Sequence, residues 1–140
     1  FSLLGFTAGE MSDYERLRLS LGLPNGSRDM EVEKATLLES GFEELNGVDF
    51  DKGCYMGQEL TARTKYRGLV KKRLMPVRIH GDPPAPGTEI IQNGKNAGEL
   101  RTTVDDIGMA LIRLEALKSD SPLTAGQATL SPQKPEWANF

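Results

Sequence analysis

A change of pattern at Gly68 most constrains what this chain can fold into. Beyond it, apolar and polar residues alternate roughly from residue 72 to residue 79. A proline-rich loop at 82–87 and the hairpin signal Asn93-Gly94 separate further short segments of the same kind. Several short strands with glycine-rich turns are typical of a small antiparallel β-barrel. We therefore predict a barrel that begins near residue 71, with strands at 72–79, 89–92, 98–104, 107–114 and 128–130.

The half before Gly68 reads as short helices and turns. Ser12 and Glu15 have the spacing of a capping box, in which each residue satisfies the backbone amide of the other. Tyr14, Leu17 and Leu21 then share one helical face, so we expect a helix over 13–21. Turn residues follow at 25–27, and a second short helix is expected over 57–65. The predicted fold class is α+β, with an α+β part over 1–67 and a C-terminal β-barrel domain over 68–140.

The most distinctive string in the chain lies at 52–59 and reads Lys-Gly-Cys-Tyr-Met-Gly-Gln-Glu. Two glycines this close suggest a backbone that turns tightly or approaches another group closely. Cys54 is the only cysteine, so it cannot form an internal disulfide or complete a zinc or iron–sulfur site by itself. We therefore predict no metal site, and Cys54 is either a reactive thiol or a small buried apolar residue.

This string resembles the signature K-G-C-Y-x-G-Q-E-x-x-A-R of the YgfZ family, which are folate-binding relatives of the aminomethyltransferase of glycine cleavage. Every fixed position matches, and Met56 stands at the free one. Residues 14–24 and 45–50 upstream, and 86–90 and 97–103 downstream, are similar to other segments of that family. Family members carry a further long stretch before this point, so the resemblance implies that the chain is the C-terminal portion of a longer protein.

The resemblance implies a three-part ring with tetrahydrofolate in its central hole. This chain would supply the end of the middle α+β region and the C-terminal barrel. Cys54 would be the functional thiol, with its reaction unknown. Candidate folate-binding residues are Lys52, Tyr55, Gln58, Glu59, Arg63 and Arg67.

Each candidate has a plain structural alternative. Tyr55 could stack on a pterin ring or fill the core. Gln58 and Glu59 could contact folate, cap a helix or pair with a neighbouring cation. The cations Lys52, Arg63 and Arg67 could hold a glutamate carboxylate of folate, arginine with two parallel bonds, or could be ordinary surface charges.

The net charge of −3 conceals a strong segregation of charge. Between residues 60 and 81 there are seven of the 17 Lys and Arg residues and no acid. Such a block is a candidate anion-binding surface for a polyglutamate tail, a phosphate or RNA, or else a solvated strand and linker.

The resemblance implies an accessory protein that binds tetrahydrofolate and supports iron–sulfur cluster assembly or repair, and through it enzymes such as those that modify tRNA. Its partners would be folate, iron–sulfur assembly factors or client enzymes. Two other functions remain open: an aminomethyltransferase that moves a one-carbon unit to tetrahydrofolate, and a module that binds protein or RNA through its basic face. We expect a bacterial cytoplasmic location, or the mitochondrial matrix in a eukaryote, and no membrane span, since no apolar run approaches the roughly 18 residues required.

Overall fold

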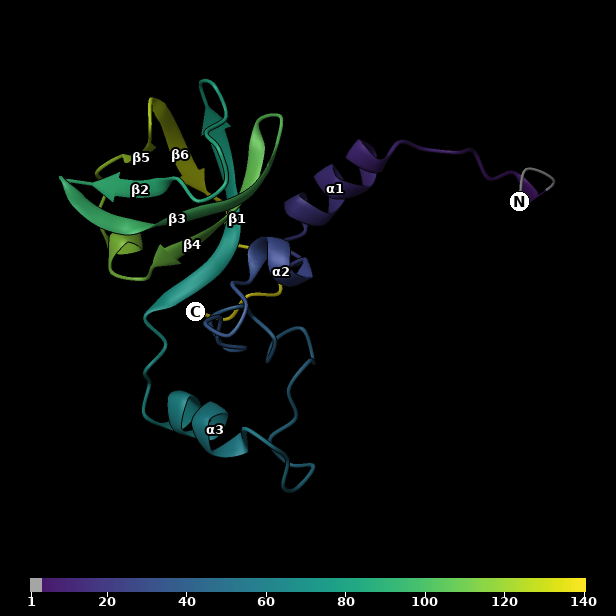
Figure 1. Cartoon of the computed structure of the whole chain (residues 1–140), viewed down its shortest axis with the longest axis vertical. Helices are drawn as coiled ribbons and strands as arrows, with labels where there is room; N and C mark the ends of the chain where they lie inside the picture. The colour runs from purple at the N-terminus through teal and green to yellow at the C-terminus, as the bar shows by residue number, and fades with distance from the viewer. Residues whose placement is uncertain (1–3) are drawn as a thin grey trace.

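The computed structural model describes residues 4–140, and its centre is a closed barrel of six antiparallel strands (Figure 1). The strands are β1 (Lys72–His80), β2 (Glu89–Gln92), β3 (Lys95–Val104), β4 (Ile107–Arg113), β5 (Leu123–Ala125) and β6 (Ala128–Pro132). Around the barrel they follow the order β1-β4-β3-β2-β5-β6, and β1 closes it by pairing with both β4 and β6. The predicted barrel is confirmed, while β5, with only three residues, was not predicted.

The barrel interior is apolar and closely packed. Met75, Val77 and Ile79 alternate along β1 and face Ile112 and Leu130 in one buried cluster. Gly98 lets two strands approach closely, because a Cβ at this position would lie 2.2 Å from the carbonyl oxygen of Leu111 on β4.

Helix α1 (Met11–Ser20) covers part of the outer surface of the barrel. Its fully buried Leu19 packs with Leu74, Ile107 and Met109, which lie on the opposite face of β1 and β4 from the barrel core. Both faces of these two strands are therefore covered, which explains why burial along them is nearly continuous rather than alternating.

Two local predictions for α1 are wrong. The helix begins two residues earlier than expected, and its N-terminal cap is Glu10, whose backbone amide donates to the Asp13 carboxylate at 3.1 Å. Ser12 and Glu15 do not form the box, because the Glu15 side chain is buried in an ion cluster instead. In addition, the segment predicted as a turn at 25–27 forms part of a short helix, α2 (Gly26–Asp29).

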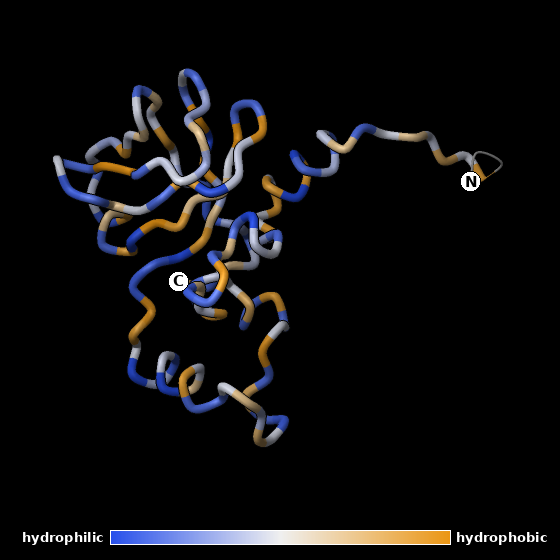
Figure 2. The backbone as a smooth tube through the Cα atoms, in the orientation of Figure 1, coloured by the Kyte–Doolittle hydropathy of each residue, from blue (hydrophilic) through white to orange (hydrophobic). Residues whose placement is uncertain are grey.

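The segment between α2 and the barrel is rich in turns and carries the third helix, α3 (Gln58–Tyr66). None of the residues of α3 is buried. Figure 1 shows α3 set apart from the barrel, at the bottom of the view. Figure 2 shows apolar residues both in the barrel and in the segment that carries α3. A short 3₁₀ helix, η2 (Ala116–Lys118), connects β4 to β5.

The C-terminal segment, residues 133–140, joins the N-terminal half to the barrel. Gln133 donates its backbone amide to Pro76 on β1, and the Trp137 indole N–H donates to the carbonyl of Leu21 at 2.7 Å. Phe140 packs against the barrel core, whereas Trp137 contacts the end of α1 and Gly41. The segment therefore holds two separate parts of the chain together.

Candidate functional site

The signature segment forms an exposed loop that leads into α3. Gly53 and Gly57 have φ angles of +92° and +88°, which glycine adopts without steric cost. Gly57 is the N-cap of α3, so the backbone reverses direction immediately before Gln58. The tight turn predicted from the two glycines is confirmed.

Cys54 lies in this loop as a free and exposed residue. An exposed thiol does not contribute to a packed core, so the interpretation of Cys54 as a buried apolar residue is wrong. The two signature cations Lys52 and Arg63 interact with other side chains rather than with Cys54. The Lys52 ammonium lies 5.1 Å from the centre of the Tyr55 ring, and Arg63 pairs with Glu59 one turn away on α3.

A cavity of about 360 Å³ lies between the signature and the segment 35–38. Lys52 and Tyr55 are the only predicted folate-binding residues among those that line it; the others are outside its wall. Much of the remaining wall is apolar and includes Leu37, Val48 and Leu60. The turns at 35–38 and 47–48, the signature loop and α3 together form this wall, so sequence spacing gave no signal for it.

Two hydroxyl groups in this wall lack hydrogen-bond partners. The Tyr55 Oη and the Thr36 Oγ1 are both buried, and within residues 4–140 neither forms a hydrogen bond. Buried polar atoms in folded proteins are nearly always paired with protein, water or ligand. The Tyr55 residue itself lines the cavity, whereas the two hydroxyl oxygens have almost no accessible surface. The accessible wall thus combines an aromatic residue and the Lys52 side chain with aliphatic side chains, which fits a flat aromatic ligand.

The remaining predicted residues lie on the exposed surface of α3 and beyond. Glu59 pairs with Arg63 along the helix, which corresponds to the structural alternative for both residues. Gln58 begins α3, and Arg67 is its C-cap. The structure thus places two of the six predicted binding residues at one cavity and leaves four outside it.

The basic block at 60–81 is less cationic in the fold than in the sequence. Four of its seven cations form ion pairs with carboxylates; these pairs are Arg63–Glu59, Lys65–Glu43, Arg73–Glu44 and Arg78–Asp106. The hydrogen bond from Lys65 to Glu43, at 2.5 Å, raises the pKa of Lys65. Among the ion pairs of residues 4–140, only Arg67, Lys71 and Lys72 of this block take no part, so its free positive charge is small.

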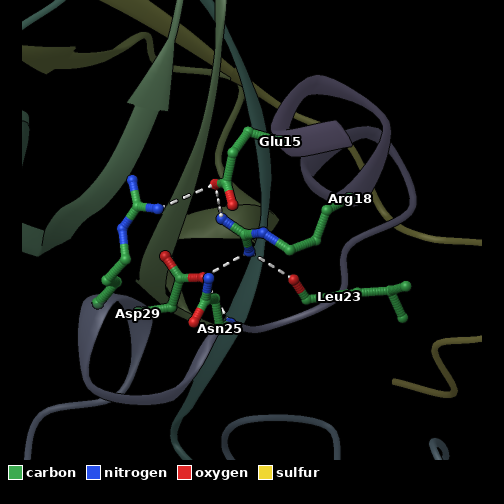
Figure 3. Close-up of polar contacts among 6 residues, drawn as sticks. Glu15, Arg18, Leu23, Asn25 and Asp29 are labelled. Carbon is green, nitrogen blue, oxygen red and sulfur yellow. Dashed lines mark hydrogen bonds and ion pairs between the residues drawn. The ribbon is translucent and has the colours of Figure 1, made fainter. Parts of the chain in front are cut away.

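A buried ion cluster joins α1 to α2 (Figure 3). The Arg18 guanidinium donates to Glu15 at 2.8 Å, to Asp29 at 2.7 Å and to the Leu23 carbonyl at 2.6 Å. The three charged side chains are at most 8% exposed. The hydrogen bond from Arg18 holds the pKa of Glu15 below its ordinary value. Burial alone would lower the pKa of Arg18, but its bonds and charges with the two carboxylates outweigh burial and raise it.

The function of the cluster is structural. Arg18 lies in the segment 14–24 that shares a pattern with the YgfZ family, and its side chain fixes the chain reversal between the two helices. The sequence pattern did not predict this cluster, because charged side chains usually lie in solvent and only apolar residues are expected in the interior.

The described part of the chain shows no metal site and no membrane-spanning helix. Within residues 4–140, no three His, Cys, Asp or Glu side chains are arranged to hold a metal ion. None of the helices there is both long and apolar enough to cross a membrane.

Comparison with known proteins identifies relatives over most of the chain. The iron–sulfur cluster assembly factor IBA57, mitochondrial, of Mus musculus is 39% identical over 142 residues, which cover 92% of this chain and 38% of that protein. The protein of the same name from Homo sapiens is 38% identical, covering 95% of this chain and 40% of its own length. The homolog from Coccidioides immitis is 32% identical over 89% of this chain. The chain thus spans about two fifths of the length of the mouse and human relatives.

A family model described as the CAF17 C-terminal beta-barrel domain matches residues 71–140. The match coincides with the closed barrel and the C-terminal segment that follows it. At a coarse level this family agrees with the YgfZ-type resemblance carried by the signature. The chain belongs to the family of the CAF17 C-terminal β-barrel domain.

Proposed function

We propose that this chain is part of an iron–sulfur cluster assembly factor, with Cys54 as its functional thiol. The observation that carries the proposal is the complete match of the signature, which the fold presents in an exposed loop with its cysteine accessible. The mouse, human and fungal relatives are named as iron–sulfur cluster assembly factors, which supports the same role. Those relatives are mitochondrial, which favours the matrix over the bacterial cytoplasm.

A complementation experiment tests the role of the thiol. In cells that lack the full-length protein, we expect Cys54→Ser to leave iron–sulfur enzymes inactive, because a hydroxyl lacks the nucleophilicity of a thiolate. Asp51→Ser is the control, since Asp51 is exposed immediately before the signature and does not line the neighbouring cavity. Full rescue by Cys54→Ser would refute the proposal.

We further propose that the full-length protein binds tetrahydrofolate at the cavity beside the signature. The Tyr55 ring would stack on the heterocycle, and Lys52, Arg63 and Arg67 would attract the glutamate carboxylate. Gln58 and Glu59 would lie at the margin. Folate would supply one-carbon chemistry when bound, while the residues of this chain bind and orient it.

We expect residues 1–140 alone to bind folate much more weakly than the full-length protein. A micromolar affinity corresponds to about 8 kcal/mol, whereas exposed charge pairs contribute about 0–1 kcal/mol each. Calorimetry on both proteins tests this expectation, and equal affinities would mean that the whole site lies within this chain.

The two alternative functions predict different experimental results. An aminomethyltransferase would move a one-carbon unit from methylamine-lipoyl protein to tetrahydrofolate, and a direct transfer assay would detect it. A protein or RNA interaction module would bind its partner through the basic segment in the absence of folate. The extensive pairing of cations in that segment argues against the interaction module.

A further inference from the structure

Helix α3 begins at the signature, yet little of the fold holds it in place. None of its residues is buried, and within residues 4–140 no other helix and no strand packs substantially against it (Figure 1). One of its faces, with Leu60, Thr61 and Thr64, borders the cavity beside the signature instead of a packed core. The direction in which α3 points therefore sets the shape of that cavity.

The side chains that tie α3 to distant parts of the described chain lie at its C-terminal end. The Lys65 ammonium donates to Oε1 of Glu43 at 2.5 Å and lies 4.0 Å from the centre of the Phe50 ring. Tyr66 packs edge-on against the same ring, with 6.3 Å between the two ring centres. An ammonium group over an aromatic ring is attracted by the negative face of the ring. One lysine thus joins α3 to a carboxylate and to an aromatic ring outside the helix.

The neighbouring carboxylate, Glu44, binds the barrel instead of α3. One nitrogen of Arg73, on β1, lies 2.9 and 3.1 Å from the two Glu44 oxygens, and both side chains are only 11% exposed. The Arg73 guanidinium also lies 5.0 Å from the centre of the Phe140 ring. Because Glu43 and Glu44 are adjacent in one turn, their two ion pairs link α3 to the barrel through that turn.

We propose that Lys65 is a positioning residue, which holds α3 through Glu43 and so shapes the cavity beside the signature for its ligand. The inference rests on the proposed function, in which that cavity binds tetrahydrofolate. Lys65 does not line the cavity, so its effect passes through the direction of the helix.

The pair controls α3 rather than the whole fold. Partly exposed ion pairs contribute little to overall stability, and Lys65 and Glu43 are each about one third exposed. However, α3 has no buried side chain whose packing would keep it in place once the pair is lost. Loss of the pair should therefore loosen α3 and leave the barrel folded.

Charge reversal at Glu43 in the full-length protein tests the proposal. In Glu43→Lys the Lys65 ammonium meets a like charge, whereas the double variant Glu43→Lys/Lys65→Glu restores opposite charges. Glu31→Lys is the matched control, because Glu31 also pairs with a lysine at 2.5 Å. Its partner Lys34 is only three residues away, so that pair does not hold α3.

Cleavage by chymotrypsin measures how firmly α3 is held. The enzyme cuts after aromatic residues, and Tyr66, the last residue of α3, is 74% exposed. We expect Glu43→Lys to be cut after Tyr66 about threefold faster or more than the control, with the same midpoint in urea, and the double variant to be cut at close to the wild-type rate. Equal cleavage of Glu43→Lys and Glu31→Lys would overturn the proposal, as would a lower urea midpoint for Glu43→Lys, which would show a role in overall stability.

Calorimetry with tetrahydrofolate measures the effect on the ligand. Glu43→Lys should bind about threefold more weakly or less, and the double variant should recover most of the affinity, whereas the control should match the wild type. Unchanged affinity in Glu43→Lys would overturn the proposal. Absence of binding by the wild type would instead refute the proposed folate site, and the chymotrypsin comparison would still decide whether Lys65 positions α3.

Discussion

Replacing Arg18 by methionine should destabilise the protein strongly at neutral pH. The substitution preserves most of the side-chain volume but leaves Glu15 and Asp29 buried without their shared partner. Removing one member of a buried ion pair costs about 3–5 kcal/mol. Because Asp29 keeps the amide of Asn25 at 2.8 Å and Glu15 keeps Arg28 at 3.4 Å, we expect a value near the lower end, about 3 kcal/mol.

Urea denaturation provides the measurement, followed by circular dichroism and by the fluorescence of Trp137, the single tryptophan. Arg16→Met is the matched control: it also removes an arginine from α1, but Arg16 is 45% exposed and pairs with Asp105 and Asp106 at the surface. Exposed pairs of this kind stabilise little, so the control should change stability only slightly. A loss below about 1 kcal/mol for Arg18→Met would refute the reasoning.

The effect should also depend on pH in a defined direction. The pKa of Glu15 is lowered in the fold, so its ion pair stabilises the protein above the ordinary glutamate pKa of 4.5 and is lost as the pH falls through the lowered value. In Arg18→Met the buried Glu15 carboxylate has lost this partner, so its protonation removes an unfavourable charge and stabilises the folded variant. The difference in stability between the two proteins should therefore shrink from about pH 7 to about pH 4, and a difference that grows on acidification would contradict this.

Three further outcomes are expected. Cys54→Ser should match the wild type in urea denaturation, because the side chain is exposed, and a loss above about 1 kcal/mol would show a packing role. Gly98→Ala should destabilise the barrel by several kcal/mol, since its Cβ would lie 2.2 Å from the Leu111 oxygen; wild-type stability would show that the strands can separate there. Trp137→Phe should cost about 0.5–1.5 kcal/mol by removing the hydrogen bond to the Leu21 carbonyl, and an unchanged midpoint in urea would show that water replaces the indole.

The barrel was predictable from sequence because its signals are local. Alternation along β1 and the Asn93-Gly94 turn each depend on a few neighbouring residues. The strand β5 was missed because Leu123–Ala125 is too short to show a period.

Most of the other unpredicted features depend on contacts between positions far apart in the sequence. Lys65 pairs with Glu43, 22 positions away, and Arg73 pairs with Glu44, 29 positions away, so a count of charges overstated the basic surface. Similarly, the spacing of Tyr14 and Leu17 correctly predicted a helix, yet the face that carries them is exposed. The helix is instead held by the buried Leu19 and by the ion cluster of Arg18. The cavity at the signature includes Thr36, whose contribution depends entirely on how the turns fold.

The C-terminal segment also has a consequence for how the chain is made. A ribosome delivers α1 more than a hundred residues before Trp137, and all six strands emerge before the segment that holds α1 at Leu21. The barrel can thus close while the end of α1 still lacks its hydrogen bond from Trp137, and the surface beside Leu21 and Gly41 that the indole covers is open during synthesis. Domains generally fold as units as they emerge, and transiently exposed apolar surface favours aggregation. The junction between the two halves is therefore the last part to be completed, and the nascent chain is most exposed to chaperones and to misassembly just before residues 133–140 appear.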